Sequence, residues 1–270
     1  MHWFDIGVNL TNERFDIEQV ITRAGDAGVE SMLITGTSVE ESMKALEICR
    51  QSTKGLYCTA GIHPHHASEF GPQSYATLFT LCQDPKVLAV GECGLDFNRN
   101  FSSPQQQLYA FEQQLILACE LQLPVFLHER DAFAEQISLL KKYRKNLIGG
   151  VVHCFTGDCA QMLAYLELDL YIGITGWLCD PVRGMALREA VLNLPLERLM
   201  LETDAPYLRP KGLAKNRVVD KGNNEPAYLP YIAGQLSEIM ALDVNIIKRH
   251  SYLNCLSLFG LNHQDYRHAN

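Results

Sequence analysis

The stretch VLAVGECGLDFNRNFSSPQQQLYAFEQQLILACELQLPVFLH, residues 87–128, decides the fold class. It begins with a short apolar run, Val87–Gly91, and ends with another, Val125–Leu127. Between them, Ser103 and Pro104 have the form of a helix start, and apolar residues follow at helical spacing. A strand, a helix and a second strand in this order indicate one unit of a parallel sheet.

The same alternation extends through the rest of the chain. Eight short apolar runs lack strict alternation with polar residues, which is typical of parallel strands buried on both faces. We expect strands at Trp3–Val8, Ser31–Thr35, Leu56–Ile62, Val87–Gly91, Val125–Leu127, Gly150–Val152, Tyr171–Ile174 and Leu199–Leu201. Ser38 and Glu41 fit a capping box at one helix start, and the last helices are expected from about Pro226 to Leu261.

Eight strand–helix units in 270 residues favour closure of the sheet into one (β/α)8 TIM barrel, a single domain over residues 1–270. An open, doubly wound sheet is the alternative. Against it, no glycine-rich phosphate-binding loop of the Rossmann or P-loop type follows any predicted strand. The polar tail, Asn262 to Asn270, has no assigned role.

Composition and charge limit the classes of function. The formal net charge is -8, from 23 Lys and Arg against 31 Asp and Glu. Because an acidic protein repels nucleic acid, any contact with it must come from a local basic patch, from metal ions or from both. Nine cysteines without a C-x-x-C pair argue against a cysteine-based zinc site and indicate reduced thiols.

The location of the protein is also constrained by the sequence. The N-terminus has no basic and apolar regions of a signal peptide, and no apolar run approaches the roughly 20 residues that span a bilayer. We therefore expect a cytoplasmic protein without membrane association. Nothing in the sequence indicates a protein partner, and we expect a monomer.

Polar side chains follow several predicted strands directly, at the end where barrel active sites lie. Glu92 follows the fourth strand, His128 the fifth and His153 the sixth. Carboxylate and neutral imidazole bind divalent zinc, manganese or magnesium, and a catalytic site needs about three protein ligands. The sequence therefore predicts a metal site formed by these three residues.

Other polar residues at the strand ends have separate expected roles. Asp204, after the last strand, can take a proton from metal-bound water or hold a second ion. For Glu202, a buried structural role in an ion pair with a nearby Arg and a functional role are equally supported. His63 is expected to face the site as a catalytic residue, whereas His65 and His66 are expected in the outer part of the loop.

A basic segment follows the last strand. Within thirteen positions it contains one acid, Asp220, and five basic residues. The basic residues are Arg209, Lys211, Lys215, Arg217 and Lys221. Such a patch can hold a phosphate backbone, and Tyr207 can stack on a base of a single strand. Arg99 and Arg130, after the fourth and fifth strands, are further candidates for phosphate contact.

Five motifs together resemble the TatD-type metal-dependent deoxyribonucleases of the amidohydrolase superfamily. They are GIHPH (61–65), GECGLDF (91–97), PVFLHERDA (124–132), HCFTG (153–157) and ETDAPY (202–207). The resemblance runs from about Phe4 to Gly260. It implies a (β/α)8 barrel and a 3′–5′ exonuclease that hydrolyses phosphodiester bonds of single-stranded DNA and RNA.

The resemblance also implies roles for individual residues. By motif, Glu92, His128 and His153 are metal ligands, Asp204 is a second-metal ligand or catalytic acid, and His63 lies in the site. The implied cofactor is Mg²⁺, with Mn²⁺ and Zn²⁺ as alternatives.

One departure from the family pattern affects the metal count. Most of the family begins the first strand with D-x-H-x-H, whose two histidines bind one ion of a pair. Here Gly7 and Asn9 stand at those positions. Two outcomes fit: one firmly held ion, or a second hard ion bound loosely through water and substrate phosphate.

Two other classes of function are compatible with this sequence. A small-molecule amidohydrolase or lactonase could use the same metal site, although the fourth strand ends in Glu92 rather than a lysine and the basic loop suits a polyanion. A non-catalytic nucleic-acid-binding barrel would explain the missing first-strand histidines but not the retained acidic and histidine residues.

Overall fold

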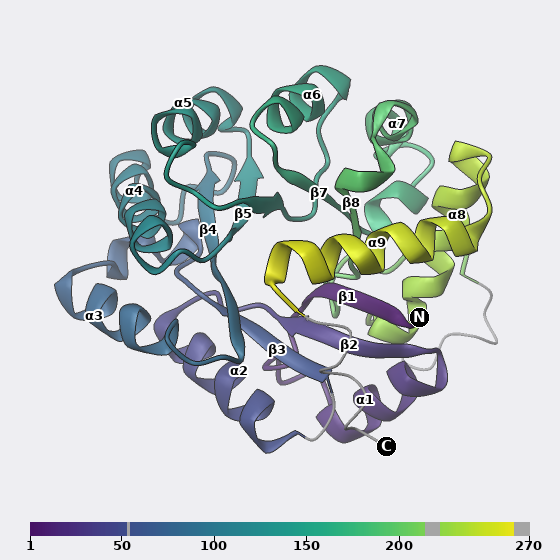
Figure 1. The fold of residues 1–270 in the computed structure, drawn as a ribbon, viewed down its shortest axis with the longest axis horizontal. Helices are drawn as coiled ribbons and strands as arrows, with labels where there is room; N and C mark the ends of the chain where they lie inside the picture. Colours follow the sequence, from purple (N-terminus) through teal and green to yellow (C-terminus); the bar gives the residue numbers. More distant parts are fainter. Residues whose placement is uncertain (53–54, 214–221, 262–270) are drawn as a thin grey trace. The chain divides into compact units, whose positions relative to one another are not determined.

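The computed structural model describes residues 1–52, 55–213 and 222–261. Within them, eight strands form a sheet in which each strand neighbours the next along the chain (Figure 1). The strands are β1 (Trp3–Val8), β2 (Val29–Ile34), β3 (Gly55–Ala60), β4 (Val87–Asp96), β5 (Val125–Arg130), β6 (Gly150–Val152), β7 (Tyr171–Ile174) and β8 (Leu199–Leu201). Val8 also bridges Ala205, just beyond β8. The fold is therefore the predicted (β/α)8 barrel.

Helices separate consecutive strands. They are α1 (Ile17–Asp26), α2 (Val39–Gln51), α3 (Pro72–Leu81), α4 (Pro104–Leu121), α5 (Phe133–Tyr143), α6 (Cys159–Glu167), α7 (Met185–Ala190), α8 (Leu229–Met240) and α9 (Val244–Phe259). The last two confirm the helices expected after Pro226. No helix in the described ranges is long and apolar enough to cross a membrane.

Local capping chemistry sets two of the predicted helix starts. Ser103 and Gln106 form a complete capping box at the start of α4, with Pro104 in its first turn. Ser38 accepts the backbone N–H of Glu41 at 3.1 Å, as predicted for α2. Only this half of the predicted box is formed, and the Glu41 carboxylate accepts a hydrogen bond from Lys44 at 3.0 Å.

Four strands have the predicted bounds, and the others differ at their ends. β2 and β3 begin and end one or two residues earlier than expected. β4 continues beyond Gly91 because Cys93 and Leu95 are buried and the strand pairs with β5 as far as Arg130. Glu92 and His128 therefore lie within their strands rather than after them.

The chain divides into two compact units. One comprises Met1–Leu33, Cys154–Leu163 and Ile172–Asn270, and the other comprises Ile34–His153 and Ala164–Tyr171. The second unit contains β3, β4, β5 and β6 with their parallel pairings. The first contains β1 and β8, and β7 pairs with β8.

Candidate active site

Glu92 is buried in the second half of β4, with 6% of its surface exposed. Its backbone N–H donates to the carbonyl oxygen of Gly36 at 2.7 Å. The preceding Gly91 has a φ of +148°, and a Cβ there would lie 2.3 Å from the carbonyl oxygen of Phe126 on β5. A side chain at position 91 would force β4 and β5 apart, so glycine permits the backbone that carries Glu92.

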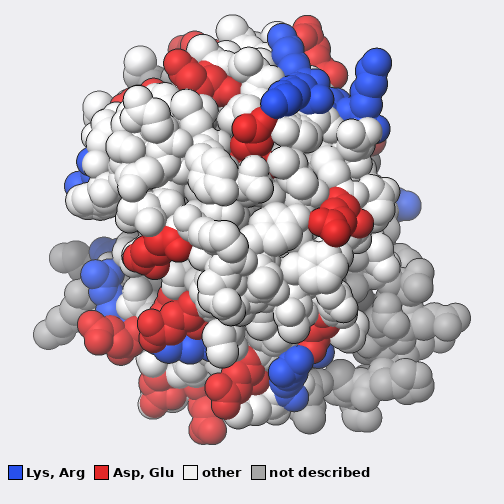
Figure 2. Space-filling view, turned by 90° about the vertical axis from the view of Figure 1, so that its left-hand side faces the viewer, with Lys and Arg blue, Asp and Glu red and all other residues white. Residues whose placement is uncertain are grey.

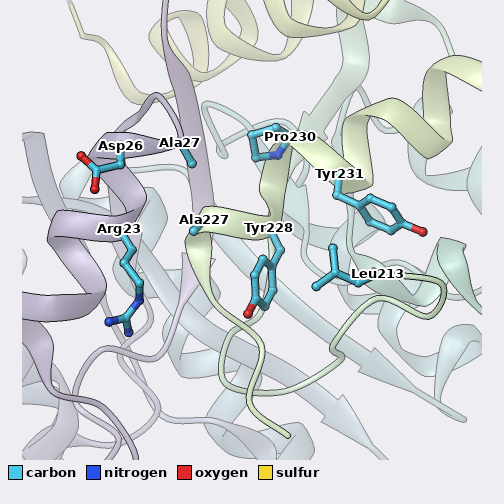
Figure 3. Close-up of a pocket in the computed structure, with 8 residues that line it drawn as sticks. All are labelled: Arg23, Asp26, Ala27, Leu213, Ala227, Tyr228, Pro230 and Tyr231. Atoms are coloured by element: carbon cyan, nitrogen blue, oxygen red, sulfur yellow. The ribbon is translucent and has the colours of Figure 1, made fainter. Parts of the chain in front are cut away.

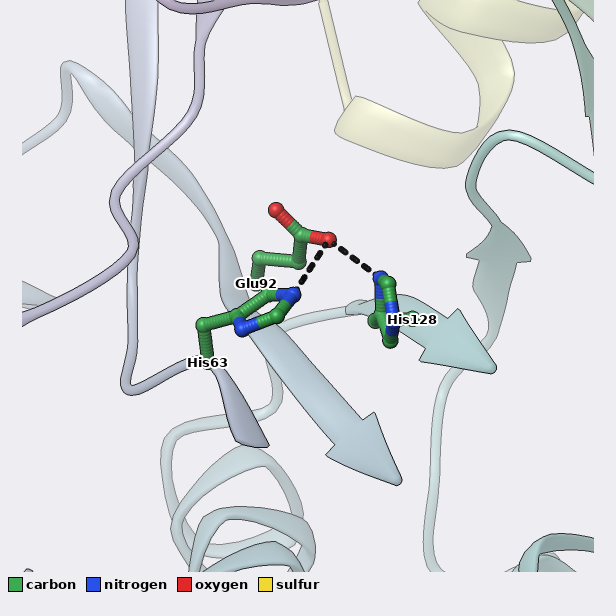
Figure 4. Close-up of side chains that lie close together, drawn as sticks. All are labelled: His63, Glu92 and His128. Atoms are coloured by element: carbon green, nitrogen blue, oxygen red, sulfur yellow. Dashed lines mark hydrogen bonds and ion pairs between the residues drawn. The ribbon is translucent and has the colours of Figure 1, made fainter. Parts of the chain in front are cut away.

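Three imidazole rings surround one oxygen of the Glu92 carboxylate. Its Oε1 lies 2.9 Å from Nδ1 of His128, 3.5 Å from Nε2 of His63 and 3.9 Å from Nε2 of His153. Figure 4 shows the rings of His63 and His128 on either side of this oxygen. The ligand atoms of these two histidines and Glu92 lie within 4.8 Å of one another, a spacing that can hold a metal ion. We call the four residues the Glu92 group.

His63 is fixed by the turn that follows β3. Its backbone N–H donates to Thr37, and its Nδ1 accepts the backbone N–H of His65 at 3.1 Å. Because Nδ1 is the acceptor, the neutral ring carries its proton on Nε2, the nitrogen that faces Glu92. His63 therefore presents a hydrogen-bond donor to the site.

His153 directly follows β6, as predicted, and is 5% exposed. Its backbone N–H donates to the carbonyl oxygen of Leu127 at 2.8 Å. Its ring lies against Phe126, with the ring centres 4.7 Å apart and the planes inclined by 32°. Backbone pairing and ring packing thus hold this imidazole beside Glu92.

Asp96 forms a second carboxylate contact with the histidines, which the candidate residues predicted from the sequence do not include. Its Oδ2 lies 2.8 Å from Nε2 of His65 and 3.6 Å from Nε2 of His128. The expected outer position is correct for the exposed His66, which pairs with Glu69, and wrong for His65. This contact forms because His65 follows His63 and Pro64 in the turn after β3, and because β4 extends to Asp96.

The charges of the Glu92 group follow from burial and from these contacts. Burial raises the pKa of Glu92, but the imidazoles of His63, His153 and His128 outweigh it and hold that pKa well below its usual range. Burial lowers the pKa of His128, but interactions with Asp96 and Glu92 reverse this and raise it to about 9. Burial lowers the pKa of His63 well below its ordinary value, so this ring is neutral.

Asp204 lies just after β8, in a left-handed conformation with φ of 55°. Its backbone N–H donates to Gly7 at 2.8 Å, and its Oδ1 accepts a hydrogen bond from Nδ2 of Asn9 at 3.1 Å. Asn9 also donates to the carbonyl oxygen of Ala205. The two first-strand positions where the family pattern has histidine therefore contact Asp204 through a backbone carbonyl and a side-chain amide.

Glu202 is completely buried, and its Oε1 accepts the backbone N–H of Cys154 at 2.5 Å. This contact anchors the chain just after His153. The structural role is therefore supported through a backbone amide.

The residues predicted to contact the substrate, as far as the structure describes them, lie on the surface. Tyr207 is 45% exposed, and Arg99, Arg130 and Arg209 are exposed. Nζ of Lys211 lies 2.8 Å from a carboxylate oxygen of Asp180. Lys215, Arg217 and Lys221 lie outside the described residues.

A cavity of about 430 Å³ lies elsewhere, beside the end of α1 and the start of α8 (Figure 3). Its walls include Tyr228, Tyr231 and Arg23, whose guanidinium forms two hydrogen bonds with Glu225 at 2.7 and 2.8 Å. No histidine or cysteine lies among its described lining residues, so its walls do not resemble the Glu92 group.

Comparisons with known proteins identify the family to which the sequence is similar. The model of the family "TatD related DNase" matches residues 4–260. A protein of Erwinia amylovora named 3′-5′ ssDNA/RNA exonuclease TatD is 50% identical over 260 residues, covering 96% of this chain and 100% of the relative. A protein of the same name from Erwinia tasmaniensis is 49% identical, with the same coverage. The crystal structure of a TatD homologue from Escherichia coli superposes with a TM-score of 0.86 at 29% identity, covering 96% of this chain and 98% of the other.

Proposed function

The chain belongs to the family of TatD-related DNases, and we propose that the Glu92 group is the centre at which this nuclease hydrolyses phosphodiester bonds. The relatives at about half identity are named 3′-5′ ssDNA/RNA exonucleases. The reaction is accordingly removal of nucleotides from the 3′ end of single-stranded DNA or RNA. The observation that carries the location is the convergence of three imidazoles on one buried carboxylate oxygen.

The residues of the group fit a divalent metal ion. A carboxylate and imidazoles are suitable ligands, and Nε2 of His128 is buried without a hydrogen-bond partner among the described residues. We assign the ion to Glu92, His128 and His153, with Mg²⁺ as the resident cation and Mn²⁺ or Zn²⁺ as substitutes. When bound, such an ion offsets charge on the phosphate and makes a nearby water more acidic.

His63 acts as a hydrogen-bond donor in this proposal. Its Nδ1 already accepts the His65 amide, so binding a metal through Nε2 would require loss of that hydrogen bond. With the proton on Nε2, the ring can donate to a non-bridging phosphate oxygen as negative charge develops there. The low pKa of His63 keeps the ring neutral, so no proton has to leave it before the substrate binds.

Asp204 is assigned the role of proton acceptor for the attacking water. Its carboxylate accepts a hydrogen bond from Asn9, which fixes its direction. An amide in place of the family's histidine thus keeps Asp204 oriented. The same carboxylate is the candidate ligand for a second, loosely held ion.

Binding of the nucleic acid depends on local charge in this acidic protein. On the face that Figure 2 shows, described basic side chains stand in small groups beside acidic ones and form no continuous patch. We assign substrate contacts to Tyr207, Arg209 and Lys211 after β8, and to Arg99 and Arg130 after β4 and in β5. The proposed working form is a cytoplasmic monomer, consistent with nine cysteines that are all free thiols.

The test is degradation of single-stranded oligonucleotides labelled at the 3′ or the 5′ end, with Mg²⁺, Mn²⁺, Zn²⁺ or EDTA. Wild-type protein and His128→Ala are assayed in parallel. Stepwise loss from the 3′ end that requires both metal and His128 is the expected result. Metal-independent cleavage, or full activity of His128→Ala, would contradict the assignment.

A further inference from the structure

Trp177 lies in the turn η2 (Gly176–Cys179), which follows β7, and its ring is paired with the side chain of Arg183 just after that turn. The guanidinium carbon of Arg183 lies 4.5 Å from the ring centre of Trp177. The indole N–H donates to the carbonyl oxygen of Arg183 at 3.1 Å. These two contacts fix the ring and the guanidinium in one arrangement.

Asp180 forms ion pairs with Arg183 and with a second cationic side chain, Lys211. Asp180 is 2% exposed, and its Oδ1 accepts the backbone N–H groups of Val182 and Arg183, both at 3.0 Å. Its Oδ2 lies 2.7 Å from Nε of Arg183 and 2.8 Å from Nζ of Lys211. These two cationic side chains are 59% and 56% exposed. Two cations on one carboxylate leave local positive charge at the surface, as a phosphate requires.

The segment after β8 lies against the same turn. A Cβ added to Gly176 would lie 2.3 Å from the carbonyl oxygen of Leu208 and 3.2 Å from the nitrogen of Pro210. Next to this contact, the half-exposed Tyr207 accepts a hydrogen bond from Asn12 at 3.2 Å, and the guanidinium of Arg14 lies 5.6 Å from its ring centre. Each of the two contacting residues, Gly176 and Leu208, is therefore the chain neighbour of an aromatic residue that is paired with an arginine.

We propose that Trp177 and Arg183 form a stacking layer for a base of the single-stranded substrate, with Tyr207 as the next layer and Lys211 contacting a phosphate. The proposal rests on the proposed nuclease function and adds a specific binding position to it. Aromatic rings and guanidinium planes stack on bases of any sequence. Bases are accessible in a single strand but remain stacked and paired in a duplex, so this surface selects single strands. Fixed cations beside the rings favour a polyanion over an apolar protein surface.

Intrinsic fluorescence can report on this layer, because the chain has only two tryptophans and Trp3 is 8% exposed. The double variant Trp3→Phe, Glu92→Gln leaves Trp177 as the single reporter on a protein that cannot cleave. Titration with oligothymidylate is expected to quench its emission. The matched variant Trp177→Phe, Glu92→Gln retains only Trp3 and is expected to keep its emission.

Affinity supplies the second readout. In the Glu92→Gln protein, Trp177→Ala is expected to weaken oligonucleotide binding roughly tenfold, and in the cleaving enzyme the effect should fall on KM. Trp177→Phe should restore most of the affinity, and Arg183→Gln should weaken binding without removing the ring. Unchanged emission at saturating oligonucleotide, or wild-type affinity of Trp177→Ala, would overturn the stacking layer. A wild-type protein that cleaves no oligonucleotide would overturn the proposed function, and the titration would still test the layer.

Discussion

The carboxylates of Glu92 and Asp204 are contacted by different kinds of group. Glu92 has three imidazole nitrogens within 3.9 Å of a single oxygen. Asp204 accepts a side-chain amide from Asn9 at 3.1 Å, and its backbone N–H is held by Gly7. An amide can only donate a hydrogen bond to a carboxylate, whereas the imidazoles assigned as ligands, His128 and His153, can also bind a cation. The surroundings of Glu92 therefore suit a firmly bound metal ion, and those of Asp204 suit an oriented base.

The largest effects are expected when each carboxylate is replaced by its amide, and the two variants should differ in metal affinity. Glu92→Gln should lower both metal affinity and exonuclease activity, with the rate reduced about a thousandfold or more. Asp204→Asn keeps an acceptor for Asn9 and should retain the firmly bound metal while losing about 10²–10³-fold in rate. Metal affinity is measured by calorimetry, with Glu69→Gln as the exposed control. Loss of the metal in both variants, or in neither, would break the distinction.

A smaller effect is expected at His63. His63→Ala should reduce kcat about a hundredfold because the phosphate loses a donor, while the metal affinity stays close to that of the wild type. His63→Gln places an amide N–H near the position of Nε2 and should recover part of the rate, whereas His63→Asn should not. A large fall in metal affinity for His63→Ala would instead make this residue a ligand.

Asn9 tests the other half of the comparison. Asn9→Ala removes the hydrogen bond that orients Asp204 and should lower activity by about tenfold, as for residues that position catalytic groups. Asn9→Asp places a second carboxylate beside Asp204 and should raise the pH at which activity appears, because the like charge opposes ionisation. Both are read from the pH profile of cleavage. A profile unchanged in Asn9→Asp would show that Asp204 does not titrate in the reaction.

The smallest effect concerns stability rather than activity. Asp5 is fully buried, and burial outweighs its hydrogen bonds from Thr203 and Gly7 and raises its pKa to about 7 from 3.8. The folded state thus favours protonated Asp5, so this stabilisation is complete below pH 3.8 and is lost as the pH rises through about 7. Asp5→Asn should flatten that part of the stability curve in urea unfolding. Parallel curves for both proteins would contradict the raised pKa.

Much of the fold could be predicted because its signals are local. Apolar runs such as Gly150–Val152 and the serine–proline helix start at Ser103 are readable without knowledge of neighbours. The length of β4 could not be predicted from the sequence, because its extension to Asp96 depends on pairing with β5. Boundaries set by partner strands cannot be inferred from one stretch alone.

The candidate site divides in the same way. That Glu92, His128 and His153 come together could be predicted because each lies at or near the end of an apolar run. The contact between His65 and Asp96 depends on the geometry of the turn after His63, and the partner of Glu202 on where Cys154 lies. Trp177 was not predicted as a binding residue, because that role is proposed from its contact with Arg183 and from the ion pair of Arg183 with Asp180. These contacts cannot be read from the sequence.

We propose that Glu92, His128 and His153 hold the metal ion of this nuclease. The most direct measurement is anomalous diffraction from crystals soaked in Mn²⁺, with Glu92→Gln crystals treated in the same way. We expect a strong peak within bonding distance of Glu92, His128 and His153 in the wild type, and its loss in the variant. A catalytically active crystal with its strongest peak elsewhere, or an equal peak in the variant, would contradict it.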